Sequence, residues 1–222
     1  MPFSDIVDPL RLSLLVALTA TFVVAIAGGA LGRYLAVRDH VGKDFLDGLA
    51  SLPLFLPPTV LGYYLTLLIG RNGPIGSLLD HAGIGLTFNW IGAAVASAIV
   101  AFPLMVRSAR SAFEGIDPAI EECAALDGAS RAERWRSIIL PLARNGLTGG
   151  VVLAFGRAIG EFGATLMVSG NIPGRTQTLP LAIYDAFTVG DDRKAGILAA
   201  LLTAVSLVVV ILGLRLGRRE KG

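Results

Sequence analysis

The chain has little charge, one cysteine and two histidines. Asp, Glu, Lys and Arg make up 16% of its 222 residues, whereas an average soluble domain contains about 25%. Because 54% of the residues are hydrophobic, the chain has too much apolar surface to be disordered, and a soluble globule of this size would need more polar surface. The single cysteine, Cys123, excludes an internal disulfide. This composition is typical of a polytopic membrane protein.

The sequence also lacks the motifs of common catalytic and nucleotide-binding sites. His40 and His81 are in no metal-ligand spacing, and neither H-E-x-x-H nor G-x-S-x-G occurs. Gly42-Lys43 lacks the earlier P-loop glycine and is followed by Asp44. We therefore expect no catalytic residue, no metal and no cofactor on this chain, and the net charge of +2 indicates no nucleic-acid partner. An integral membrane enzyme is the alternative from another class, and it would need catalytic side chains converging at one membrane face.

Long uncharged stretches separate the charged residues. The ranges 12–32, 48–70, 82–106 and 195–214 contain no Asp, Glu, Lys or Arg, and a membrane-spanning helix needs about 20 apolar residues. A fifth apolar stretch, 145–170, contains only two charged residues, Arg157 and Glu161. A cleavable signal peptide is the competing interpretation of 12–32, but acidic residues precede it and it is too long. We predict an all-α domain over 1–222 with five spans, at about 11–36, 46–70, 86–108, 143–169 and 194–215.

The positive charges indicate the orientation of these spans. Most of the 19 Lys and Arg residues lie in 33–47, 107–144 and 215–222. Cytoplasmic segments carry an excess of Lys and Arg. We therefore expect the N-terminus outside and the C-terminus in the cytoplasm.

The longest cytoplasmic connection, 109–142, is predicted to form two short helices. Asp117 can cap the first helix, and Gly128 can end it in a left-handed conformation. Ser130 and Glu133 have the spacing of a capping box for the second helix. Such a loop either lies on lipid headgroups as an amphipathic segment or docks a soluble partner. Its acidic residues argue against simple adhesion to anionic lipid.

The same loop contains a glutamate with two small residues, a glycine after three more, and an I-x-L-P segment after a further nine: Glu122-Cys123-Ala124, Gly128 and Ile138-Ile139-Leu140-Pro141. This spacing resembles the EAA signature of ABC importer permeases, with Cys123 in place of the first alanine. The resemblance implies that the first short helix is a coupling helix, which inserts into a groove of a cytoplasmic ATPase. It assigns coupling contacts to Glu121, Glu122, Ala124, Leu126, Gly128 and Ala129.

Three further stretches, 52–65, 102–117 and 156–186, are similar to the molybdate permeases of this family. Sulfate permeases resemble the chain around G-E-F-G-A but have an additional span, and tungstate permeases are close relatives. The resemblance implies the type I importer permease fold in a bacterial inner membrane. It also implies four kinds of partner: a second copy of the chain, two ATPase subunits that bind ATP and Mg, an extracytoplasmic molybdate-binding protein and the surrounding lipid bilayer.

Charged and helix-breaking residues inside the spans are the candidates for a translocation pathway. Arg157 and Glu161 are four residues apart, which places them on one helical face as either a structural ion pair or a polar lining. The prolines of the second span bend it either as a static kink or at the pathway. The candidate pathway or gate residues are Pro57, Pro58, Thr59, Arg157, Glu161, Phe162 and Gly163.

Two further features are predicted from the glycines and turn-forming residues. The pairs Gly28/Gly32 and Gly156/Gly160 have the small-xxx-small spacing that allows helices to approach closely. The outer segment 170–194 is rich in turn-forming residues, with a short helix expected near 179–187. By resemblance, this segment lies where the binding protein would dock.

Overall fold

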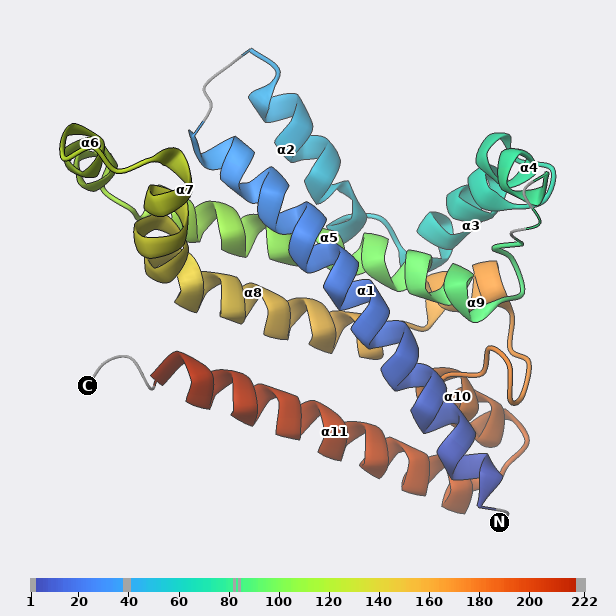
Figure 1. Cartoon of the computed structure of the whole chain (residues 1–222). Helices are drawn as coiled ribbons and strands as arrows, with labels where there is room; N and C mark the ends of the chain where they lie inside the picture. The colour runs from blue at the N-terminus through green and yellow to red at the C-terminus, as the bar shows by residue number, and fades with distance from the viewer. Residues whose placement is uncertain (1–2, 38–40, 82, 84, 219–222) are drawn as a thin grey trace.

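The computed structural model describes residues 3–37, 41–81, 83 and 85–218. Within these residues every regular element is a helix, as Figure 1 shows. In chain order the elements are α1 (Ser4–Val37), α2 (Lys43–Ser51), η1 (Leu52–Leu54), α3 (Pro58–Ile69), α4 (Pro74–Asp80), α5 (Trp90–Glu114), α6 (Pro118–Leu126), α7 (Arg131–Arg134), η2 (Trp135–Ile139), α8 (Leu140–Ile159), α9 (Gly163–Ser169), α10 (Leu179–Thr188) and α11 (Asp192–Arg218).

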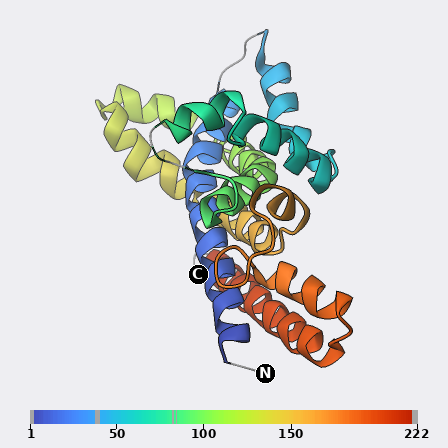
Figure 2. The same cartoon turned by 90° about the vertical axis from the view of Figure 1, so that its right-hand side faces the viewer.

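Helices α1, α5 and α8 form the centre of the molecule. The main buried cluster joins residues of these three helices, and most of them are alanines. Helix α1 crosses α5 and α8, while α11 packs along α8 and α10 (Figures 1 and 2). Small side chains at such crossings let the backbones approach closely, which favours van der Waals packing between apolar helices.

Glycines shape these crossings, although not all at the predicted positions. A Cβ on Gly32 would lie 2.6 Å from the Cβ of Ala109 on α5, and one on Gly28 would lie 3.1 Å from the Cβ of Met105. The predicted contact through the first pair is therefore confirmed. On α8, however, the close contact to α5 includes Gly150, whose Cβ would lie 2.8 Å from the Cβ of Ser108.

The prediction of close packing at Gly156 and Gly160 is wrong for contacts within this chain. A Cβ on Gly156 would meet open space, and one on Gly160 would meet nothing nearer than a carbonyl oxygen 3.6 Å away. Both glycines are exposed. The spacing alone does not reveal which face of the helix meets a neighbour.

Among the described residues, four helices are long and apolar enough to cross a membrane. The number rises to five if one bent pair of helices is counted as a single span. That pair is Lys43–Leu54 with Pro58–Ile69, and its two parts are bent by 112°. The kink expected within 46–70 is thus a complete break between η1 and α3. Proline lacks an N–H group and disfavours a helical conformation in the residue before it, so the double proline ends one helix and starts the next.

The stretch expected to span at 143–169 is also broken. Helix α8 ends at Ile159 and α9 begins at Gly163, with Gly160 as the C-cap of α8. The predicted spans 11–36, 86–108 and 194–215 lie largely within α1, α5 and α11. Helix α5 begins later than expected, at Trp90, and continues to Glu114.

The connection 109–142 contains the predicted caps. The side chain of Asp117 accepts the N–H of Ala119 at 2.9 Å, and Gly128 has a φ of +88°, a left-handed conformation that favours glycine. Ser130 and Glu133 form the capping box, with the Ser130 N–H donating to Glu133 Oε2 at 2.8 Å. Both predictions of a helix start are confirmed.

The sequence predicts that the second short helix is separate from the next span, but in the structure the two are continuous. Helix α7 runs through the wider turn η2 into α8. The Leu140 N–H donates to the Trp135 carbonyl oxygen, five residues earlier. This wide turn immediately precedes Pro141, whose ring would collide with a carbonyl of the preceding turn in a regular α-helix. The π-turn therefore lets the helix continue through the proline.

Candidate functional site: two helix breaks and a projecting helix

The two helix breaks meet in space. A Cβ on Gly163, the first residue of α9, would lie 3.0 Å from the Cβ of Pro58 and 3.4 Å from the backbone nitrogen of Thr59. A Cβ on Gly62 would lie 2.9 Å from the Cα of Ala164. Helices α3 and α9 therefore pack backbone to backbone from their first turns. The structure brings together residues that the sequence had placed in different spans.

The first turn of α3 at this junction is accessible. Pro57, Pro58 and Thr59 are all exposed. Pro57 and Pro58 have no N–H group, so the backbone N–H groups without a partner within the helix are those of Thr59 and Val60. This turn therefore offers polar groups within an otherwise apolar part of the chain.

Glu161 joins the two sides of the second break. Its Oε2 lies 2.8 Å from Nη1 of Arg157 at the end of α8, and its Oε1 accepts the N–H of Ala164 in α9 at 2.8 Å. Only 3% of Glu161 is exposed. The prediction that both charges lie on one continuous helical face is wrong, because Glu161 follows the end of α8. The ion pair itself is present.

The arrangement lowers the positive charge that Arg157 presents. Its side chain is 32% exposed, whereas that of Glu161 is 1% exposed. A neighbouring carboxylate offsets much of the attraction that a guanidinium has for an anion. Next to this pair, the Phe162 ring packs 5.1 Å from the ring of Tyr184 on α10. The second break therefore also contacts the segment that follows α9.

The segment 170–178 is a compact connection rather than a simple surface loop. Thr176 and Thr178 are buried, and Oγ1 of Thr176 accepts the N–H of Ile172 at 3.0 Å. At its end, the Leu179 N–H donates to Oγ of Ser13 on α1 at 2.7 Å. The short helix expected near 179–187 is α10 (Leu179–Thr188).

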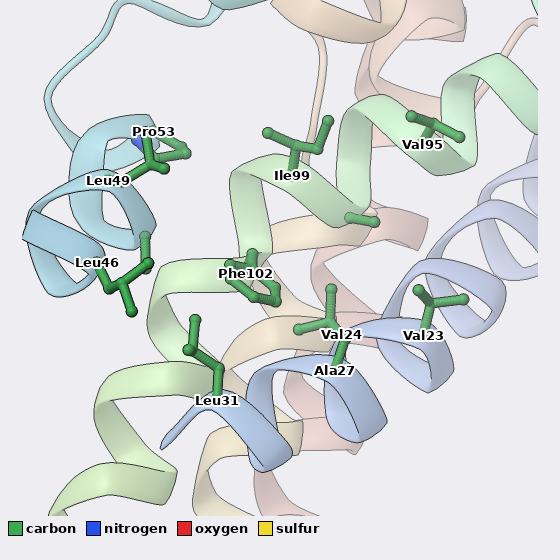
Figure 3. A pocket seen from close by; sticks show the side chains of 12 residues that line it. Val23, Val24, Ala27, Leu31, Leu46, Leu49, Pro53, Val95, Ile99 and Phe102 are labelled. Carbon is green, nitrogen blue, oxygen red and sulfur yellow. The ribbon is translucent and has the colours of Figure 1, made fainter. Parts of the chain in front are cut away.

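A cavity of about 460 Å³ lies between α1, α2, η1 and α5. Figure 3 shows apolar side chains from these elements around it, including Val23, Leu46, Pro53 and Phe102. All of its lining side chains are apolar. An oxyanion that entered it would lose its hydration without gaining polar partners there. This cavity therefore does not fit an oxyanion.

Helix α6 projects from the molecule, as Figure 1 shows. It has no buried residue, and the side chain of Leu126 is 87% exposed. Glu122 and Gly128 are also exposed, while Ala124 and Ala129 are half-buried. An exposed large apolar side chain on a protruding helix favours contact with another protein.

Glu121 differs from the other predicted coupling contacts because it faces the rest of the chain. Its Oε2 lies 3.2 Å from Nη2 of Arg33 at the end of α1, and its Oε1 lies 3.9 Å from Nε of Arg134. In the sequence, Arg33 is one of the cations of the predicted cytoplasmic segment 33–47. Nothing in the spacing connects two residues that are 88 positions apart, so this contact could be found only in the folded chain.

Comparison with known proteins identifies the class of protein that has this fold. The family described as the binding-protein-dependent transport system inner membrane component matches residues 25–219, and the chain belongs to this family. Among solved structures, the chain superimposes with a TM-score of 0.75 on a bacterial alginate ABC transporter in complex with a periplasmic protein. That match covers 96% of this chain and 78% of the other at 18% identity. The fold is that of a type I ABC importer permease.

Relatives of higher identity are named as permease proteins of molybdenum and sulfate transport systems. The molybdenum transport system permease protein ModB of Escherichia coli K12 is 42% identical over 193 residues, covering 86% of this chain and 84% of ModB. The sulfate transport system permease protein CysT of Salmonella typhimurium is 36% identical over 215 residues, covering 93% of this chain and 78% of CysT.

Proposed function

We propose that this chain is the membrane-spanning permease subunit of an ABC importer that moves molybdate into the cell. The similarity to ModB over most of both chains carries the proposal. The exposed helix α6 supports it, because that helix holds the EAA-like residues and presents Leu126 to solvent. The chain does not hydrolyse ATP in this proposal. ATP and Mg bind to a partner subunit.

The proposed assembly contains two copies of this chain, two cytoplasmic ATPase subunits and an extracytoplasmic binding protein. The complex of the alginate transporter with a periplasmic protein supports the last partner. The chain would lie in a bacterial inner membrane, with its N-terminus outside and its C-terminus inside, as the Lys and Arg distribution favours. ATP binding would draw the two α6 helices together, and this would favour one of two states of the permease pair.

The pathway for the anion is proposed to pass the junction of the two helix breaks. Thr59 and the first turn of α3 offer polar groups there, and Arg157 offers a positive charge that Glu161 partly neutralises. A conduit must release the anion again, so a weak and transient attraction suits it better than tight binding would. Glu161 also holds α9 against α8, so in this proposal it acts mainly as a gate or packing element.

The main alternative is that the same kind of importer carries a different anion. The likeness to CysT favours sulfate as a second candidate, and tungstate has the same charge and shape as molybdate. The chain would then work in the same way with a different binding protein. An integral membrane enzyme is the alternative from another class, and the absence of a catalytic motif from the sequence argues against it.

Uptake by the purified complex tests this function. The chain is reconstituted in liposomes with its ATPase, and molybdate-loaded binding protein is placed opposite the ATPase. We expect ATP-dependent uptake of molybdate that excess tungstate inhibits and excess sulfate does not. No uptake from the molybdate-binding protein, together with ATP-dependent uptake from a sulfate-binding protein, would assign the chain to sulfate. A chain that never associates with an ATPase subunit would contradict the importer function.

A further inference from the structure

Helix α6 forms ion pairs with α1 and α7. It has no buried residue, and it is connected through Gly115 on one side and Gly128 on the other. Its Glu121 pairs with Arg33 on α1 at 3.2 Å and approaches Arg134 of α7 at 3.9 Å. A helix without any buried residue has little packing to hold it against the body of a protein, so it can swivel about its connections. The contacts of Glu121 oppose this swivelling.

Arg33 is itself fixed by two aromatic rings. Its guanidinium carbon lies 5.2 Å from the centre of the Phe113 ring on α5 and 5.9 Å from that of Trp135. The two rings are stacked on each other, with centres 5.9 Å apart and planes inclined by 27°. Cation–π contacts of this kind restrict a cation to one position. Arg33 therefore links the end of α1 to α5, to η2 and to α6.

We propose that Arg33 and Glu121 form a clasp that makes α1 and α5 move together with the coupling helix. This inference rests on the proposed function, in which the ATPase moves α6. With the clasp closed, a displacement of α6 reaches α1 through the ion pair and α5 through Phe113. With the clasp open, α6 turns about its glycine-containing connections, and part of the displacement is lost. Both side chains are positioning residues, because they transmit the movement without contacting the transported anion.

The clasp is tested in the reconstituted complex by measuring uptake and ATP hydrolysis in the same vesicles. Arg33 is not among the predicted contacts with the ATPase, so for Arg33→Gln we expect normal assembly, near-normal ATP hydrolysis and about a fivefold or greater loss of uptake per ATP. Glu121→Gln should show the same loss of uptake per ATP. Arg33→Lys keeps the positive charge and should keep most of the wild-type ratio of uptake to ATP hydrolysis. Glu114→Gln is the matched control, since Glu114 pairs with Arg110 within α5, and it should keep the wild-type ratio.

A distance measurement reports on the clasp without any transport. Spin labels on Cys123, the single cysteine, and on Val37→Cys at the exposed end of α1 give the α6–α1 distance distribution. We expect a narrow distribution in the labelled parent chain and with Glu114→Gln. Glu121→Gln and Arg33→Gln should broaden it. An unchanged width in both variants would overturn the clasp, and so would an unchanged ratio of uptake to ATP hydrolysis.

These outcomes separate the clasp from the proposed function. If the wild-type complex takes up no oxyanion, the proposed function fails, whatever the width of the distance distribution. If the wild-type complex transports molybdate and Glu121→Gln transports it with the same yield per ATP, the clasp fails and the proposed function stands.

Discussion

At Gly32 the backbones of α1 and α5 leave no room for a side chain. A Cβ there would lie 2.8 Å from the Val106 carbonyl oxygen and 2.6 Å from the Cβ of Ala109. Gly32→Ala should therefore separate the helices at a cost of about 1–3 kcal/mol. We expect the thermal midpoint in detergent to fall by about 5 °C. Gly48→Ala is the control, because a Cβ there meets open space. An unchanged midpoint for Gly32→Ala would contradict this packing.

Glu161 has a buried carboxylate with two partners. Glu161→Ala removes both contacts and leaves the Ala164 N–H and Arg157 without that acceptor. Because the Arg157 side chain is 32% exposed, the main cost is the unsatisfied N–H group, and we expect a destabilisation of about 1–3 kcal/mol. Glu161→Gln keeps an acceptor for the N–H and removes the charge. We expect it to assemble normally and to transport less molybdate per ATP.

Thermal midpoints and uptake, measured on the same preparations, check this prediction for Glu161. The double substitution Arg157→Gln/Glu161→Gln serves as a control for stability, since replacing both partners leaves no unpaired charge. It should be more stable than Glu161→Ala. If Glu161→Gln leaves both ATP hydrolysis and uptake unchanged, Glu161 is not a gate.

At the residue scale, the sequence predicts local interactions better than distant ones. The capping box of Ser130 and Glu133 and the pairing of Arg157 with Glu161 depend on spacing along the chain, and both are present. The contact between Arg33 and Glu121 joins the C-terminal part of α1 to α6. Its geometry depends on the way α1 crosses α5, which a single sequence does not encode in any short pattern.

At the scale of elements, the two helix breaks differ in how well they could be predicted. Two consecutive prolines end a helix for steric reasons, so the bend before α3 follows from Pro57 and Pro58. The break after Ile159 occurs at glycine, but Gly149 and Gly150 lie within the same helix without breaking it. Glycine permits a break without requiring one. The contacts with α3 and the buried carboxylate of Glu161 accompany the break at this position.

Helix α6 is proposed to act as an element that docks on the ATPase through its exposed face. Leu126→Ser should weaken binding of the ATPase by about fivefold or more, because fully burying a leucine side chain contributes about 1.5–3 kcal/mol. It should leave the thermal midpoint of the chain unchanged, since Leu126 is 87% exposed. Affinity measurement with the purified ATPase checks this. Leu78→Ser on α4, where the leucine is 77% exposed, should not change the affinity.

On the scale of the whole molecule, the orientation in the membrane follows from Lys and Arg counts, and Cys123 can test it. This cysteine is free and exposed on α6. A membrane-impermeant maleimide should label it in inside-out vesicles and not in right-side-out vesicles, because α6 is expected in the cytoplasm. Bound ATPase should protect it. Cys123→Ser with Val189→Cys, an exposed position after α10, should show the opposite labelling. Labelling of Cys123 from outside would reverse the proposed topology and separate α6 from any cytoplasmic ATPase.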